Sequence, residues 1–328
     1  MGQYSTDKAR KRILLRRVRR QRLKYITILP SLITLLNGIC GFAAIGFASK
    51  GAAHFSFHRL DMPYFAWAGY LIFIAMIADM LDGRVARMSQ TTSSFGGQLD
   101  SICDIISFGV APAFLVMKIL EYKLTDLVGP TPVISDFVGR LIWLAAAVYM
   151  ACAAIRLARF NVENEEDETS HMSFMGLPTP AAAGVLASLI VFHQYILETQ
   201  DMLPESAKGS LFFTVSENAI IYSLPFVAIG VAILMISRIR YPHIVNQYLK
   251  GRKPIAHLLW SVGIIGLVYL CGLQSALVIT FCGFALSGFC RWFYYKIIVF
   301  KNPGRNNNEQ SLTLNVSEPS SDTQDYTQ

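Results

Sequence analysis

Four aspartates stand out in the 26-residue stretch DMLDGRVARMSQTTSSFGGQLDSICD, which is flanked on both sides by apolar sequence. Asp79 and Asp82 are three residues apart, and Asp100 and Asp104 are four apart, so each pair shares one face of a helix. Charged side chains at the ends of membrane helices are costly and are usually functional. If the two helices are antiparallel, the pairs can meet, and their carboxylates then repel one another unless cations neutralise them.

The residue types around these aspartates favour phosphate chemistry. Oxygen ligands without cysteine or histidine indicate Mg²⁺ or Mn²⁺ rather than zinc. Two such cations, about 3.5–4 Å apart, suit a displacement at phosphorus. Gly83 lets a ligand approach the backbone, Arg87 offers a forked donor to phosphate, and Ser93 adds a hydroxyl near a helix start, where anions are favoured.

Each of these features has a simpler explanation when it is taken alone. A single aspartate at a helix end is most often a cap, and Gly83 or Gly96 can serve helix packing. Acids in membrane helices also form cation sites in transporters, which typically place them near the bilayer midplane in broken helices related by an internal repeat. No such repeat is visible here. An inert lipid-binding scaffold would be expected to have lost an aspartate, and none is lost.

Composition indicates the class of protein that positions these residues. A soluble domain usually carries about 25% charged residues, whereas 16% of the 328 residues here are charged and 53% are hydrophobic. The deficit lies in long apolar runs, which predicts an all-α polytopic membrane protein. The six cysteines form no CxxC pair, so neither a disulfide framework nor a thiolate metal site is indicated.

Runs of about 20 apolar residues predict eight membrane helices. The last two are expected to form a hairpin around Gly272–Ser275, and five prolines are expected in or near the first turns of their helices. The predicted spans are 27–48, 64–82, 98–120, 138–160, 175–197, 218–238, 255–271 and 275–297; the prolines are Pro30, Pro63, Pro178, Pro225 and Pro254.

Basic residues predict the orientation of these spans. They crowd the N-terminal arm and the alternate loops that carry the acidic cluster, so both termini and the cluster are expected on the cytoplasmic side. The arm abuts a membrane helix, which favours anionic lipids over nucleic acid as its partner. The predicted divisions are a basic arm with a juxtamembrane helix (1–26), a catalytic transmembrane core (27–240), a C-terminal loop and helical hairpin (241–300) and a disordered cytoplasmic tail (301–328).

The spacing of the acidic stretch resembles the signature of the CDP-alcohol phosphotransferase family. The resemblance implies a six-helix catalytic core, two divalent cations and a homodimer. It implies that Asp79, Asp82 and Asp100 are metal ligands and that Asp104 combines metal contact with the role of general base. The residues that it assigns to the CDP-diacylglycerol site are Thr34, Gly83, Ala86, Arg87, Ser93 and Gly96. The matching pattern is Asp79-x2-Asp82-Gly83-x2-Ala86-Arg87-x8-Gly96-x3-Asp100-x3-Asp104.

Flanking segments resemble the membrane-embedded phosphatidylserine synthases of that family, although Ser31 stands where these often have asparagine. The resemblance implies transfer of a phosphatidyl group from CDP-diacylglycerol to L-serine, in a bacterial plasma membrane by default. Arg156, Arg159 and Asn161 are candidates for binding serine. The signature leaves other acceptors open, namely glycerol 3-phosphate, inositol phosphate or choline. The resembling segments are LPSLITLLNGICGFAAI, SFGVAPAFL, AIRLARFN and FMGLPTPAAA.

Overall fold

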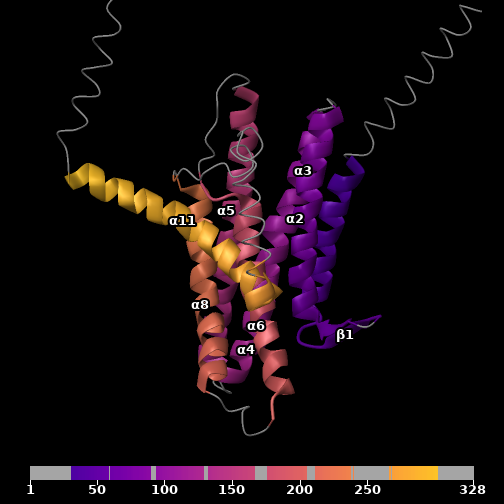
Figure 1. Cartoon of the computed structure of the whole chain (residues 1–328), viewed down its shortest axis with the longest axis vertical. Coiled ribbons are helices and arrows are strands. Elements are labelled where there is room, and N and C mark those ends of the chain that lie inside the picture. The colour runs from indigo at the N-terminus through magenta and orange to yellow at the C-terminus, as the bar shows by residue number, and fades with distance from the viewer. Residues whose placement is uncertain are drawn as a thin grey trace, which may run out of the picture.

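Long helices dominate the computed structural model, as the apolar runs require (Figure 1). Seven of them, within the residues that the structure describes, are long and apolar enough to cross a membrane. The fold is therefore that of an all-α polytopic membrane protein, as predicted. The residues described are 31–58, 60–89, 94–128, 132–166, 176–204, 211–237, 239, 266 and 268–301.

The first span, Ser31–Ala48, leads into a short β-hairpin that was not expected from the apolar pattern. Strand β1 (His54–Phe57) pairs antiparallel with β2 (Leu60–Pro63), and helix α2 (Tyr64–Ser89) follows at once. Helix α2 extends seven residues beyond the predicted end at 82, because a helix continues through polar residues where an apolar criterion stops. The aspartate pair Asp79 and Asp82 thus lies inside the helix.

The third span is a continuous helix whose middle segment is π-helical. Helix α3 (Ser94–Asp104) passes into a π-helix, η1 (Ile105–Val110), and then into α4 (Ala111–Val128). The buried Tyr149 hydroxyl donates a hydrogen bond of 3.0 Å to the Phe108 carbonyl oxygen of η1. Short π-helical segments are rare and are frequent at functional sites, and this one begins directly after Asp104.

The remaining helices complete the bundle. Helix α6 is the most deeply buried of the candidate spans, and it packs against α2, α8 and α11. Helix α11, drawn in yellow and orange, crosses the bundle obliquely (Figure 1). Gly272, with φ +81°, forms the predicted turn before α11, but most of the predicted span 255–271 lies outside the described residues. The bounds are α5 Pro132–Glu166, α6 Thr179–Met202, α8 Leu211–Ile236 and α11 Leu273–Lys301.

The predicted position of Pro225 is wrong. Helix α8 begins at Leu211, so Pro225 lies in its interior rather than in its first turn. The residues from Leu211 to Glu217 mix polar with apolar types and were not counted in the apolar run. Pro178, in contrast, stands directly before α6, and Pro180 lies in its first turn. Pro30 and Pro254, the arm 1–26 and the tail beyond 301 lie outside the described residues.

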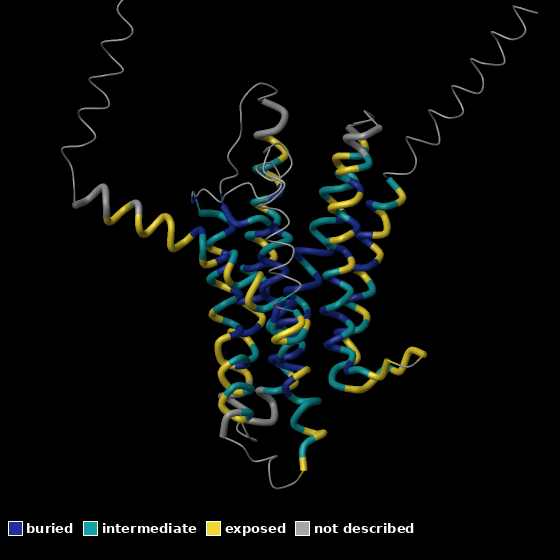
Figure 2. Tube along the Cα trace, viewed as in Figure 1, coloured by how far each residue is buried: buried dark blue, intermediate teal, exposed yellow. Residues whose placement is uncertain are grey.

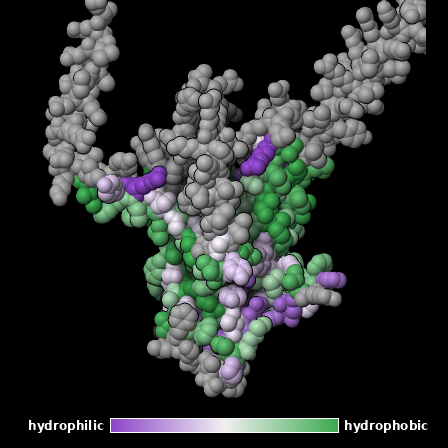
Figure 3. Space-filling model, in the orientation of Figure 1, coloured by the Kyte–Doolittle hydropathy of each residue, from purple (hydrophilic) through white to green (hydrophobic). Residues whose placement is uncertain are grey.

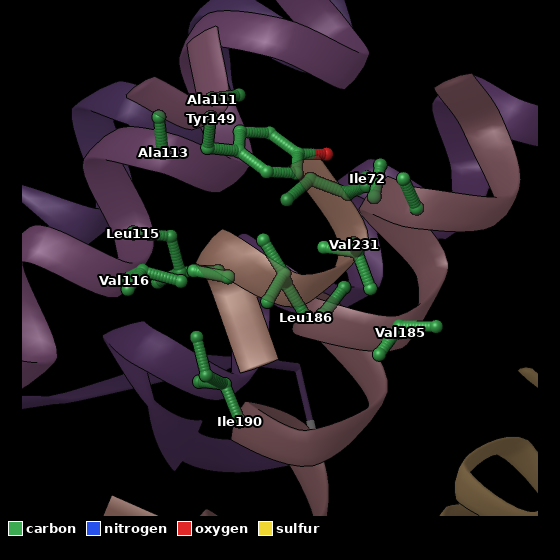
Figure 4. Packing of buried hydrophobic residues seen from close by; sticks show 14 of the residues in the cluster. Ile72, Ala111, Ala113, Leu115, Val116, Tyr149, Val185, Leu186, Ile190 and Val231 are labelled. Carbon is green, nitrogen blue, oxygen red and sulfur yellow. The ribbon is translucent and has the colours of Figure 1, made fainter. Parts of the chain in front are cut away.

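The core lies where α2, α4, α5, α6 and α8 meet, and the close-up in Figure 4 shows Ile72, Leu115, Tyr149, Leu186 and Val231 from these five helices gathered around one another. The deeply buried positions are drawn in dark blue along the centre of the bundle, whereas α11 is largely exposed (Figure 2). Hydrophobic side chains cover the outer flank of the bundle, and hydrophilic ones gather near the hairpin (Figure 3). An apolar flank of this kind suits lipid rather than water.

Candidate active site

The structure brings three of the four aspartates together. Carboxylate oxygens of Asp79, Asp82 and Asp100 all lie within 4.8 Å of one another. The first two come from the second half of α2, and the third comes from the middle of α3, so the meeting of the two helices that the spacing predicted does occur. Such a cluster of hard oxygen atoms is the donor set that Mg²⁺ or Mn²⁺ prefers.

Burial makes this cluster costly without a bound cation. Asp82 is 4% exposed, and its side chain accepts hydrogen bonds from the Thr34 hydroxyl and from the Gly83 backbone. Within the described part of the chain, Oδ2 of Asp82 and Oδ1 of Asp100 are buried without a hydrogen-bond partner. Buried acceptors of this kind normally find a partner. The residues present therefore fit a divalent cation.

Asp104 lies one helical turn beyond this cluster and has a different environment. Its carboxylate interacts electrostatically with Asp79 and Asp100. In addition, Asn37 Nδ2 donates a hydrogen bond of 2.9 Å to Asp104 Oδ1. The Ser107 hydroxyl donates to the Asn37 carbonyl oxygen at 2.8 Å, and Asn37 is fully buried. The Asn37 amide thus fixes one oxygen of Asp104.

Sequence reasoning missed Asn37. Its signal was present, since Asn37 is a polar residue inside an apolar run and lies one turn after Thr34, on the same face. Both side chains reach the aspartates from the first span.

Two glycines let the first span approach α3 and η1 closely. A Cβ at Gly38 would lie 2.9 Å from Cys103 Sγ, and one at Gly41 would lie 2.6 Å from Ser107 Cα. Small residues at such contacts are how membrane helices bring their backbones together. The close approach is what places Thr34 and Asn37 beside the acidic cluster.

The residues predicted to bind serine lie on the last turns of α5. Arg156 Nη1 donates a hydrogen bond of 2.8 Å to the Thr179 hydroxyl at the start of α6, and Arg159 Nη1 donates one of 3.4 Å to the Ile236 carbonyl oxygen at the end of α8. Asn161 Nδ2 donates to Ser101 Oγ at 2.8 Å, next to Asp100. These residues therefore share one end of the bundle with the aspartates.

A tight turn at Gly176 joins the start of α6 to the end of α8, which are the two helix ends that these arginines contact. Gly176 has φ +84°, and a Cβ there would overlap the Met235 carbonyl group, so only glycine fits. Its N–H donates to the Ile239 carbonyl oxygen at 2.9 Å, and the Leu177 N–H donates to Leu234 at 3.0 Å. The GLPTP segment thus fastens the start of α6 to the end of α8.

Three predicted contacts of the nucleotide lie beyond what the structure describes. Ser93 is outside the described residues, and the side chains of Ala86 and Arg87 are as well, although both belong to α2. Gly83 and Gly96 are placed on α2 and α3, close in sequence to the clustered aspartates.

Comparison with known proteins agrees with this site. The family model for CDP-alcohol phosphatidyltransferase matches residues 27–213, which include every aspartate of the cluster, and the chain belongs to that family. Among individual proteins, the chain is 31% identical over 278 residues to a CDP-diacylglycerol–serine O-phosphatidyltransferase of Helicobacter pylori, covering 84% of this chain and 96% of that protein.

Proteins with the same name occur among its relatives in other organisms. The chain is 32% identical over 225 residues to one from Methanocaldococcus jannaschii, with 68% of this chain and 78% of that protein covered. It is 29% identical over 215 residues to one from Bacillus subtilis, with 66% and 90% covered. These similarities span most of the helical bundle described above.

Proposed function

We propose that this protein transfers the phosphatidyl group of CDP-diacylglycerol to the hydroxyl of L-serine, giving phosphatidylserine and CMP. The observation that carries the proposal is the cluster of Asp79, Asp82 and Asp100, with oxygens within 4.8 Å of one another, inside the region matched by the family model. The names of the relatives support serine as the acceptor.

The aspartates would hold two divalent cations, Mg²⁺ or Mn²⁺. Asp79, Asp82 and Asp100 supply the main ligands, and Asp104 contributes from one turn away. When bound, the cations offset the charge of the diphosphate and of the departing CMP. Arg87 would add a forked contact to the same diphosphate, together with the CDP contacts predicted for Thr34, Gly83, Ala86, Ser93 and Gly96.

Asp104 acts as the general base in this proposal. It accepts the proton of the serine hydroxyl while the serine oxygen forms a bond to the phosphorus of the phosphatidyl group. The bond from that phosphorus to the bridging oxygen breaks, and CMP leaves with the electron pair. Asn37 donates to Oδ1 of Asp104, which leaves Oδ2 to accept the proton. A positioned base typically contributes about 10²–10⁴-fold to a rate.

The ends of α5, α6 and α8 provide the site for serine. Arg156 and Arg159 are cations suited to the serine carboxylate, and the hydrogen bonds to Thr179 and Ile236 hold them at the end of the bundle that carries the aspartates. Asn161 of α5 donates a hydrogen bond to Ser101 of α3, the residue next to Asp100. It therefore offers a polar contact to the amino group or carboxylate of serine.

The membrane setting of the proposal follows from charge and hydropathy. The seven apolar spans make the chain an integral membrane protein, and its lipid substrate can reach the aspartates from within the bilayer. The distribution of Lys and Arg supports a cytoplasmic active site, and the plasma membrane of a bacterium is the expected location. A homodimer is proposed from the family resemblance.

An acceptor assay tests the proposal directly. The purified protein in liposomes containing CDP-diacylglycerol is offered L-serine, glycerol 3-phosphate, inositol phosphate or choline in separate reactions, and CMP release and the lipid product are measured. Of the four alcohols, we expect only L-serine to cause CMP release. Release with a different alcohol would retain the phosphatidyl transfer chemistry but refute serine as the acceptor, and release with none would refute the proposal.

A further inference from the structure

The β1–β2 hairpin has one apolar face and one polar face. Cross-strand pairs in an antiparallel ladder share a face, so the pairs Phe55–Met62 and Phe57–Leu60 lie on one side and His54–Pro63 and Ser56–Asp61 lie on the other. On the polar side, Ser56 Oγ donates to Asp61 Oδ1 at 2.7 Å, and His54 Nδ1 lies 3.9 Å from Asp61 Oδ2. The hairpin is therefore amphipathic.

The apolar face is turned toward the helices. The Phe55 ring contacts Phe47, at the end of the first span, with centroids 5.4 Å apart, and Tyr64, at the start of α2, with centroids 5.6 Å apart. Trp67 Nε1 donates a hydrogen bond of 3.2 Å to the Phe55 carbonyl oxygen, and its ring lies 6.5 Å from that of Phe57. Trp67 lies about one turn inside α2. These contacts therefore hold the apolar face of the hairpin against the first span and α2.

The tip of the hairpin stays exposed despite these contacts. Phe57 is 63% exposed and Leu60 is 55% exposed, although both belong to the apolar face. The hairpin projects sideways from the lower ends of the first span and α2 (Figure 1). That span also exposes large apolar residues, among them Ile39 and Phe42. The tip thus continues an apolar surface of the kind that membrane helices present to lipid.

The position along the chain places this tip at a membrane boundary. The hairpin begins six residues after the first span ends at Ala48, and α2 begins immediately after it. Aromatic side chains accumulate at the boundary between headgroups and acyl chains, and Lys50 Nζ lies 5.0 Å above the Tyr64 ring, as suits a cation reaching toward headgroups. Asp79 lies 15 residues along α2 from Tyr64, or about 22 Å at the helical rise, so the hairpin belongs to the opposite leaflet.

From these observations we propose that the hairpin is a lipid-binding element. The exposed tip of its apolar face, formed by Phe57 and Leu60, inserts into the headgroup–acyl boundary of the leaflet opposite the aspartates, while Ser56 and Asp61 face water. It thereby holds the far ends of the first span and α2 at a fixed depth. These two helices carry Thr34, Asn37, Asp79 and Asp82 at their other ends.

Spin labels on adjacent residues test the two faces. Cys271 and Cys290, which are exposed, are first replaced by serine. A nitroxide is then attached to F57C or, as the matched control, to S56C, and the protein is reconstituted in phosphatidylcholine–phosphatidylglycerol vesicles. We expect the label at 57 to collide more with oxygen than with a water-soluble nickel complex, and the label at 56 to show the reverse. Equal preferences at both positions would overturn the proposal.

A photocrosslinker distinguishes lipid from a second copy of the chain. Phe57 is replaced by p-benzoylphenylalanine, which keeps an aromatic ring at the tip, and the reconstituted protein is illuminated and analysed by mass spectrometry. The proposal predicts phospholipid adducts at position 57. A crosslinked dimer, or the absence of any lipid adduct in protein that still releases CMP, would contradict it.

Discussion

Carboxylates have opposite environments at the two ends of the helix bundle: they are paired with a cation at one end and clustered with one another at the other. At the end away from the active site, Glu217 of α8 forms an ion pair of 2.7 Å with Lys123 of α4. The fully buried His193 of α6 lies 3.9 Å from the same carboxylate, and its Nδ1 is 3.1 Å from Gln194 Nε2. At the other end, Asp79, Asp82 and Asp100 gather within 4.8 Å of one another, and none of them takes part in the ion pairs found among the described residues.

This difference separates a structural use of charge from a functional one. The Lys123–Glu217 pair joins two helices and neutralises itself, so it contributes to the fold without a ligand. The clustered aspartates repel one another and retain unsatisfied oxygens, so without a cation they would lower the stability of the fold. Arrangements that break a local rule in this way are expected at functional sites. Mutations at the two ends should therefore have different effects on turnover and on stability.

Removal of the proposed base should have the largest effect. We expect Asp104→Asn to lower kcat by at least about 100-fold, because a positioned base contributes about 10²–10⁴-fold. Binding of CDP-diacylglycerol and the thermal stability should change little, since the amide keeps the shape of the carboxylate. CMP release, a CDP-diacylglycerol binding titration and a melting curve measure the three quantities. Near-normal turnover would refute the assignment of Asp104.

The arginines of α5 should affect serine more than the lipid. We expect Arg156→Ala and Arg159→Ala each to raise the KM for serine about tenfold or more, since a hydrogen bond to a charged group contributes about 1.5–3 kcal/mol. Arg140→Ala, an exposed position near the other end of α5, is the matched control. If the KM values for serine and for CDP-diacylglycerol both stay unchanged, neither arginine is in the site.

Asn37 should act through Asp104. Asn37→Leu keeps a similar volume but removes the donor to Asp104 Oδ1, and we expect kcat to fall about tenfold, as for the loss of a supporting hydrogen bond in a site. The KM for CDP-diacylglycerol should change less than threefold. A variant that loses stability but keeps its kcat would show that Asn37 has a packing role instead.

The ion pair at the opposite end should affect stability rather than turnover. Glu217→Gln leaves Lys123 without its partner. Because the pair is only partly buried, we expect a loss of about 1–2 kcal/mol, between the values for exposed and fully buried pairs, which corresponds to a Tm lower by roughly 2–8 °C. Glu121→Gln, in the more exposed pair with Lys118, serves as the control and should cost less than about 1 kcal/mol. Initial rates of CMP release should remain within about twofold of the parent for both variants. A large loss of activity in Glu217→Gln would remove the contrast between the two ends.

The helices and the acidic motif were predictable from the sequence because hydrophobicity and one-turn spacing are local signals. The grouping of Asp79, Asp82 and Asp100 followed from these signals because α2 and α3 meet at one end of the bundle. Helix ends were less predictable, since an apolar count stops at the first charged residues while α2 continues to Ser89. The same criterion put Pro225 near a helix start, although α8 begins fourteen residues earlier.

Other features depend on contacts between distant residues. The π-helical segment after Asp104 is accompanied by the Tyr149 hydrogen bond to Phe108, and six residues of apolar sequence carry no periodic signal for it. The role of Asn37 depends on the close approach at Gly38 and Gly41, which a single sequence does not reveal. The segment HFSF alternates polar with apolar residues, which is typical of a strand. That this strand forms an amphipathic hairpin depends on its register with LDMP.

The central claim is that the clustered aspartates hold divalent cations that the transfer of the phosphatidyl group requires. The most direct test measures CMP release by the purified protein from CDP-diacylglycerol and L-serine in excess chelator, followed by addition of Mg²⁺ or Mn²⁺. The account predicts that release falls to background in chelator and returns when either cation is supplied in excess. Undiminished release in the presence of chelator would contradict it.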